Sequence, residues 1–170
     1  MSAVDHAHDD HHDHHEQSFI EKYIFSYDHK MIGKQFLVTG LIWAFIGGGL
    51  SILFRIQLAF PDADMSWLQP LLGDWILLDD TGFGTLDPEF YLALVTMHGT
   101  IMVFFVLTAG LSGTFSNFLI PLQLGARDMA SGFMNMLSYW LFFLAGIIMF
   151  VSLFIKTGPA SGGWVIYPPL

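Results

Sequence analysis

The chain of 170 residues is 54% hydrophobic and 16% aromatic, and only 12% of its residues are charged. This composition is typical of an integral membrane protein, so we expect membrane lipid and no nucleic acid as a partner. All acidic residues except Asp128 lie within residues 1–28 or 62–89, so the apolar runs are nearly free of charge although the formal net charge is −9. Cysteine is absent, which excludes disulfides, thiolate metal sites and a cysteine nucleophile. Any bound metal must therefore use histidine or oxygen ligands.

Residues 1–26 form an acidic, histidine-rich segment. Six of the eight histidines lie in the stretch "DHAHDDHHDHHE", where they are interleaved with carboxylates. Such a tract cannot build an apolar core, so it predicts a disordered cytoplasmic tail. The same composition could instead hold a transition metal loosely. Because the start is acidic where a signal peptide is basic and then apolar, we expect no cleavable signal peptide.

Three apolar runs follow, and each is long enough to cross roughly 30 Å of hydrocarbon as a helix that rises about 1.5 Å per residue. The runs are Phe36–Phe54, Phe90 to about Leu124, and Met129–Ile155. No water is available in lipid to satisfy exposed backbone groups, so these runs must be helical. We predict an all-α, polytopic membrane protein with transmembrane helices at about residues 34–58, 90–122 and 129–156. Glycines at 47 to 49, 110 and 113 favour close packing of these helices.

The positions of the basic residues predict the orientation of the helices. Lys22, Lys30 and Lys34 precede the first helix, and Arg127 lies between the second and the third. Lysine and arginine are enriched on the cytoplasmic side of membrane proteins, so both regions should be cytoplasmic. The loop 61–89, which contains neither lysine nor arginine, is then expected to be external.

His98 is the only ionisable residue within the second apolar run, about eight residues or roughly 12 Å from its start. An ionisable side chain at this depth is costly and tends to mark a functional site. A neutral imidazole could bind iron or copper, relay protons, or bond to a carbonyl of the neighbouring helix. Arg55 follows the first uncharged run near the same outer level, where it could simply extend to the lipid headgroups.

A second polar group is predicted near the cytoplasmic face. Asn117 lies nineteen residues after His98, about 28 Å along a straight helix. Asp128 could be an ordinary acid in the first turn of the third helix, where the helix dipole favours it. Asn135 and Ser138 share one face of that helix and could bond to a neighbouring helix. A polar line from a cytoplasmic acid into the membrane is also what a proton path requires.

Several segments resemble, in order and spacing, subunit I of the haem-copper terminal oxidases, especially the cytochrome c oxidases with two A-type haems. The segments are "DHKMIG", "MHGTIMVFF", "NFLIPLQLGARDMA", "MNMLSYW" and "GWVIYPPL", and the placement of Arg55 agrees with them. The resemblance implies that residues 27–170 are the N-terminal part of such a subunit, whose complete bundle has about twelve helices.

The resemblance implies a haem site at the outer level. His98 would be one of two axial ligands of the low-spin haem A, with the second ligand on a later helix. Arg55 would approach the formyl group of this haem and raise its reduction potential. Trp164 would lie near the haem propionates, whereas Tyr167 belongs to the same segment without an assigned role.

The resemblance also implies a proton path at the cytoplasmic level. Asp128 would be the mouth of the D proton pathway, with His29 close to it. Asn117, Asn135 and Ser138 would continue the path through ordered water.

Three residues depart from the pattern of the family. Gln57 stands where many relatives have a glutamate, which puts a calcium or sodium site in doubt. Phe36 replaces a tyrosine that lines the proton path, and Arg127 replaces the proline before the aspartate. The copper ligands and the histidine of the high-spin haem belong to later helices, so we expect an incomplete subunit I.

The function implied by the resemblance is that of the catalytic subunit of a respiratory terminal oxidase. Electrons would pass through the low-spin haem to a centre of high-spin haem and CuB that reduces oxygen to water, coupled to proton pumping. The expected partners are the remainder of subunit I, subunits II and III, cytochrome c or another c-type donor, and a respiratory supercomplex in the bacterial inner membrane. A quinol-oxidising relative is the near alternative. From a different class, a non-catalytic haem-binding membrane anchor or a proton-coupled transporter stays open.

Overall fold

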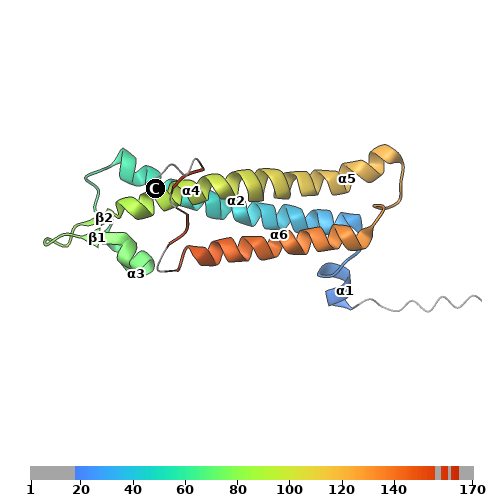
Figure 1. Ribbon diagram of the computed structural model, residues 1–170, viewed down its shortest axis with the longest axis horizontal. Helices are drawn as coiled ribbons and strands as arrows, with labels where there is room; N and C mark the ends of the chain where they lie inside the picture. The colour runs from blue at the N-terminus through green and yellow to red at the C-terminus, as the bar shows by residue number, and fades with distance from the viewer. Residues whose placement is uncertain (1–17, 156–157, 161, 165–170) are drawn as a thin grey trace, which may run out of the picture.

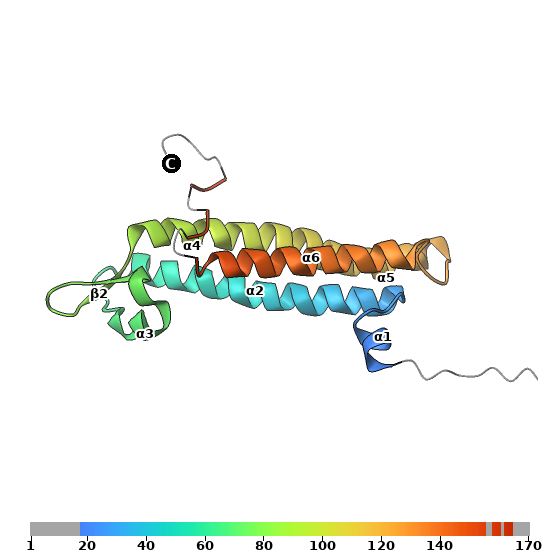
Figure 2. The same cartoon turned by 60° about the horizontal axis from the view of Figure 1, so that its bottom comes forward.

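The computed structural model describes residues 18–155, 158–160 and 162–164. Three long helices lie side by side (Figure 1, Figure 2): α2 (His29–Ala59), the continuous helix α4 (Pro88–Thr100), η3 (Ile101–Leu111) and α5 (Ser112–Leu124), and α6 (Gly132–Ser152). Each is long and apolar enough to cross a membrane, which confirms the predicted three-helix membrane fold. The histidine-rich tract before residue 18 and Tyr167 lie outside the described residues.

The first long helix, α2, begins at His29, five residues before the predicted start at 34. Asp28 caps this end, because its side chain accepts a hydrogen bond from the Lys30 N–H at 3.1 Å. Such a bond satisfies one of the free amide groups at a helix start. The polar first turn lies outside the apolar run, so hydropathy alone does not mark where this helix begins.

The second long helix changes its winding in the middle. Residues Ile101–Leu111 form the π-helical stretch η3, an uncommon geometry that often occurs near functional sites. Within it, Thr108 Oγ1 donates to the Val103 carbonyl at 2.7 Å. Gly110 crosses Gly40 of α2 so closely that a Cβ atom on Gly110 would lie 3.0 Å from the Gly40 Cα. The close packing predicted for Gly47, Gly110 and Gly113 is confirmed, but it is wrong for Gly48 and Gly49, where a Cβ atom would meet nothing within 4 Å.

The third long helix, α6, begins at Gly132 with Ser131 as its cap, three residues after the predicted start at 129. Gly146 lets the ring of Trp43 approach from α2, since a Cβ atom at 146 would lie 2.6 Å from Trp43 Cζ2. Within α6 only Tyr139 and Gly146 are buried, and many of its apolar side chains, such as Leu141 and Ile148, are exposed.

Residues 60–87 fold into a small cap at one end of the bundle (Figure 1). Its elements are η1 (Ser66–Leu68), α3 (Gln69–Leu72), η2 (Gly73–Trp75), β1 (Ile76–Leu78) and β2 (Gly84–Leu86). The two strands pair antiparallel, with Ile76 opposite Leu86, and both side chains join a buried cluster with Phe54 and Phe90. Gln57 of α2 accepts a hydrogen bond from the Leu86 N–H at 3.1 Å, which ties the cap to the bundle.

The short helix α1 (Phe19–Tyr23) lies at the opposite end (Figure 1). The chain after α1 is held against α2 by Gln35, whose Nε2 donates to the carbonyls of Tyr23 at 2.7 Å and Ile24 at 2.9 Å. Phe25 stacks on Trp140 of α6 with ring centroids 5.0 Å apart. These contacts place the segment before α2 across the groove between α2 and α6.

Candidate functional site

His98 lies near the end of α4 and is half-buried. Its Nδ1 is 2.8 Å from the Gly47 carbonyl oxygen of α2. A carbonyl oxygen only accepts hydrogen bonds, so Nδ1 must carry the proton, and Nε2 of the neutral ring keeps its lone pair. Metal-binding histidines usually donate their other ring N–H in this way. The two readings of His98, a bond to a neighbouring carbonyl and a metal ligand, are therefore compatible, and the side chain fits a haem iron at Nε2.

Arg55 is connected to His98 through one aromatic ring. The Phe54 ring packs edge-on against the His98 ring, with centroids 5.7 Å apart. The Arg55 guanidinium lies 5.9 Å from the centroid of the same Phe54 ring, and the Arg55 side chain is exposed. The end of α2 thus brings a positive charge close to the histidine without direct contact.

Two threonines of α4, which flank His98 in sequence, hold Gly163 and Trp164 against this helix. The Trp164 Nε1 donates to Thr100 Oγ1, and the Gly163 N–H donates to Thr96 Oγ1, both at 3.2 Å. The tryptophan is 56% exposed. Thr96 and Thr100 were not predicted as site residues, although they flank His98 at spacings of two residues.

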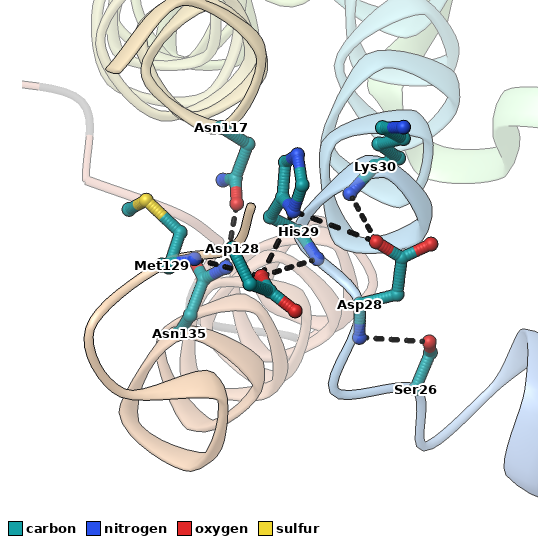
Figure 3. Close-up of polar contacts among 8 residues, drawn as sticks. All are labelled: Ser26, Asp28, His29, Lys30, Asn117, Asp128, Met129 and Asn135. Carbon is teal, nitrogen blue, oxygen red and sulfur yellow. Dashed lines mark hydrogen bonds and ion pairs between the residues drawn. The ribbon is translucent and has the colours of Figure 1, made fainter. Parts of the chain in front are cut away.

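Asp128 and His29 meet at the other end of the bundle (Figure 3). The Asp128 carboxylate lies 2.8 Å from His29 Nδ1 and accepts the Met129 N–H at 2.7 Å. Burial acts to raise the pKa of Asp128, but the hydrogen bonds from the Met129 N–H and from His29 together hold that pKa below its ordinary value. Asp28 also lies 3.5 Å from His29 Nδ1. The ligand atoms of Asp28, His29 and Asp128 lie within 4.8 Å of one another, so these three side chains could hold a cation.

The structure corrects the interpretation of Asp128 as an acid in the first turn of the third helix. That helix begins at Gly132, and Ser131 is its cap. Asp128 lies in the preceding connection and faces His29 of α2 instead (Figure 3). Its partner is therefore a side chain ninety-nine residues away in sequence and not a helix dipole.

Asn117 and Asn135 are brought together next to this pair (Figure 3). The Asn135 Nδ2 donates to Asn117 Oδ1 at 2.5 Å, and the Asn117 Nδ2 donates to the Gly113 carbonyl at 2.7 Å. Asn117 is only 2% exposed. Ser138, in contrast, is exposed, and its hydroxyl donates to the Asn135 carbonyl of its own helix at 2.6 Å. Of the predicted polar line, the structure joins the two asparagines and leaves Ser138 outside the pair.

A buried hydroxyl pair that the sequence analysis missed lies further along the bundle. Thr39 of α2 and Tyr139 of α6 are hydrogen-bonded at 3.0 Å, and each is 7% exposed. The Tyr139 ring packs edge-on against Phe36 at 5.3 Å. The sequence indicated this position only through its spacing: Tyr139 follows Asn135 by four residues and therefore lies on the same face of α6.

Comparison with known proteins agrees with these features. The family described as "Cytochrome C and Quinol oxidase polypeptide I" matches residues 31–170. The "Alternative cytochrome c oxidase subunit 1" of Bradyrhizobium diazoefficiens is 39% identical over 155 residues, which are 91% of this chain and 23% of the relative. The "Cytochrome c oxidase subunit 1" of Thermostichus vulcanus is 39% identical over 148 residues, 87% of this chain and 23% of the relative. The "Ubiquinol oxidase subunit 1" of Acetobacter aceti is 38% identical over 145 residues, 85% of this chain and 19% of the relative.

The fold and the site define a helical membrane protein with an intramembrane histidine at one level and a group of polar side chains at the other. The chain belongs to the cytochrome c and quinol oxidase polypeptide I family, which is subunit I of the haem-copper oxidases. Membership implies haem and copper as the cofactors of the family and respiratory electron transport as its setting. The chain spans less than a quarter of the length of these three relatives.

Proposed function

We propose that this chain is the part of a terminal oxidase that binds the low-spin haem and takes up protons. The complete subunit would reduce oxygen to water at a haem-copper centre and couple this reaction to proton pumping. The observation that carries the proposal is the His98–Gly47 hydrogen bond, which leaves Nε2 of an intramembrane histidine available to iron in a chain of this family.

A haem A held between two histidines has no open coordination position, so it supplies electron transfer and does not bind oxygen. In this chain His98 would hold the iron through Nε2, oriented by the Gly47 carbonyl. Arg55, one aromatic ring away, would favour the electron-rich state through its positive charge. Trp164, fixed on α4 by its bond to Thr100, would lie near the haem propionates.

The polar group at the other level would take up protons. Asp128, with its lowered pKa, stays ionised at neutral pH, so its negative charge would attract protons carried by the surrounding water. His29 lies within hydrogen-bonding distance of that carboxylate, and the Asn117–Asn135 amides would orient water above it. Ser138 would join the path if its hydroxyl turned away from the Asn135 carbonyl.

We propose that the end of the bundle that carries Lys22, the two lysines at the start of α2 and Arg127 is cytoplasmic, and that the cap formed by residues 60–87 is external. The membrane would be a bacterial inner membrane. The exposed apolar faces of α6 would be covered by the remainder of subunit I, which would also carry the high-spin haem and CuB. Subunits II and III, a c-type electron donor and a respiratory supercomplex are the proposed partners.

A quinol-oxidising protein is the second candidate, because the relative from Acetobacter aceti is named as a ubiquinol oxidase and is nearly as similar as the cytochrome c oxidases. A haem-binding anchor or a proton-coupled transporter is the alternative outside this class.

The test is to purify the complete subunit I in its complex and to record its optical spectrum and oxygen consumption. We expect an A-type haem band and oxygen consumption with reduced cytochrome c. A B-type band with activity on quinol alone would favour the second candidate. Haem without oxygen consumption would indicate an anchor, and absence of haem would contradict the proposal.

A further inference from the structure

Two buried hydroxyl groups face each other between α2 and α6, within the membrane-spanning helices. Thr39 Oγ1 and the Tyr139 hydroxyl oxygen lie 3.0 Å apart, and either group can donate the hydrogen bond. The Tyr139 ring belongs to a buried apolar cluster with Ile32 and Phe36. Two apolar groups of the same shape would stabilise this place about as well as a hydrogen-bonded pair. Packing alone therefore does not explain the two hydroxyl groups.

Tyr139 lies one turn of α6 beyond Asn135 and on the same face. Four residues correspond to about 6 Å along the helix axis. The side chains of a helix lean toward its N-terminus, so the tyrosine leans back toward the level of Asn135. A water molecule that is hydrogen-bonded to two groups spans about 5.5 Å, twice the usual O–H···O distance. A step of one turn therefore needs only one bridging water.

The neighbouring helix α2 shows the same succession of levels. A Cβ atom on Gly33 would lie 3.1 Å from the Cβ of Asn117, so Gly33 lies beside the asparagine pair. Phe36, three residues further, packs edge-on against the Tyr139 ring with centroids 5.3 Å apart. Thr39 follows after another three residues. Phe36 brings no polar group to the level beyond the asparagines, so α6 supplies the hydroxyl there through Tyr139.

Two other hydroxyl groups near this level are bonded within their own helices. Thr114 is 4% exposed, and its Oγ1 donates to the Gly110 carbonyl at 2.6 Å. Ser138 is exposed, and its hydroxyl donates to the Asn135 carbonyl. The Tyr139 hydroxyl instead joins two helices, as the Asn117–Asn135 bond does one turn earlier. Of these hydroxyls, it is the one that continues a polar connection between helices.

We propose that Tyr139 is a proton relay that extends the path from the Asn117–Asn135 pair to Thr39. The tyrosine oxygen accepts a proton from water held at the asparagines, and its hydroxyl releases its own proton to Thr39 Oγ1. One O–H bond forms and one breaks, so the tyrosine remains neutral, and Thr39 passes a proton to water beyond it in the same way. The relay rests on the proposed proton uptake through Asp128 and names the next residues of that path.

The experiment uses the complete oxidase in vesicles and removes one hydroxyl group at a time. Tyr139→Phe keeps the ring and its packing against Phe36. We expect oxygen consumption and proton uptake to slow about threefold or more, less than in Asp128→Asn, because water replaces a relay hydroxyl more readily than a charge that collects protons. Proton ejection should slow with them, and the haem spectrum should stay unchanged.

The exchanged variant, Phe36→Tyr combined with Tyr139→Phe, separates a relay from a packing role. It returns one tyrosine hydroxyl to the same pair of contacting rings from the opposite helix, so it should recover most of the lost rate. Thr39→Val, which removes the second hydroxyl at nearly constant volume, should slow turnover as Tyr139→Phe does. Tyr27→Phe is the matched control, because Tyr27 is 57% exposed near the same end of the bundle, and it should retain normal turnover.

The outcomes distinguish the relay from the proton uptake on which it rests. Normal turnover and pumping in Tyr139→Phe, together with an impaired Asp128→Asn, would overturn the relay and leave the proposed uptake intact. A slow Tyr139→Phe enzyme that the exchange does not restore, or an equal loss in Tyr27→Phe, would also overturn the relay. Normal turnover with normal pumping in Asp128→Asn would contradict the proposed uptake and the relay with it. The thermal midpoint of each variant verifies that the helices remain folded.

Discussion

Replacing Asp128 by asparagine separates a proton-collecting role from a structural one. The carboxylate is held by His29 Nδ1 at 2.8 Å and by the Met129 N–H at 2.7 Å. Asparagine keeps the size and one acceptor oxygen but removes the charge, and charge-assisted hydrogen bonds are roughly twice as strong as neutral ones. We expect a local cost of about 1–2 kcal/mol, near the lower value because the Asp128 side chain is 51% exposed and screened by solvent.

The expected effect on turnover is much larger than this structural cost. A positioned proton-transfer group contributes about 10²–10⁴-fold to a rate, and water can replace part of it, so we expect oxygen consumption to fall roughly tenfold or more. Proton ejection should fail. The haem spectrum should be unchanged, because His98 and Asn117 lie nineteen residues apart on one continuous helix and Asp128 lies beyond Asn117. The measurement is oxygen consumption with proton ejection in vesicles that contain the complete oxidase.

Asp28→Asn is the matched control for Asp128→Asn. Asp28 lies next to the same histidine, 3.5 Å from His29 Nδ1, and asparagine caps a helix as well as aspartate does. This variant should retain normal turnover. Asn135→Asp, which adds an acid higher in the same line, should disturb pumping while the haem stays in place. Normal turnover with normal pumping in Asp128→Asn would refute the proton-uptake role.

The lowered pKa of Asp128 also predicts a dependence of stability on pH. A carboxyl group with a lower pKa in the folded than in the unfolded protein stabilises the fold fully above its unfolded pKa. The contribution of Asp128 is then lost as the pH falls through its lowered folded pKa. Thermal midpoints measured from neutral to acid pH should converge for the unaltered protein and Asp128→Asn. A constant difference between them down to the lowest pH would contradict this.

Three further predictions concern the haem level and the helix packing. His98→Met should remove the low-spin haem or its spectrum, and a complete bis-histidine signature would contradict the assignment of this ligand. Arg55→Met should lower the reduction potential of the same haem in a redox titration. A shift of about 30 mV for one electron needs only about 0.7 kcal/mol of interaction. An unchanged potential would mean that Arg55 only extends to the lipid headgroups. Gly146→Ala should destabilise the bundle by about 1–3 kcal/mol in thermal unfolding because its Cβ would meet the Trp43 ring, whereas Gly49→Ala, which has open space, should not.

The sequence by itself was sufficient to predict the three spans and to select His98 within the second of them. Length and hydropathy are properties of a segment alone, and lipid leaves an apolar run of this length no other structure than a helix. His98 could be selected because a single ionisable side chain in such a run is costly wherever the helices lie. The packing role of Gly110 followed from its lack of a side chain, which permits close contact with another helix.

Hydropathy was a weaker guide to the helix ends than to the spans. The first helix starts at His29 because Asp28 caps it, and the third starts at Gly132 because Ser131 caps it. Neither boundary coincides with the edge of an apolar run. The antiparallel pair Ile76–Leu78 and Gly84–Leu86 was missed for a related reason, since three-residue strands carry too short a pattern to be recognised.

Which side chains of the polar line touch was decided only by the tertiary structure. The sequence placed Asp128, Asn117, Asn135 and Ser138 at one level, but the rotation and register of the helices determine which of them are in contact. The structure pairs the two asparagines and turns Ser138 outward, and it bonds Asp128 to His29, which the family resemblance had already placed close to it. The eleven-residue π-helical stretch before Asn117 rotates the side chains that follow it about the helix axis. Ideal α-helical spacing does not predict this rotation.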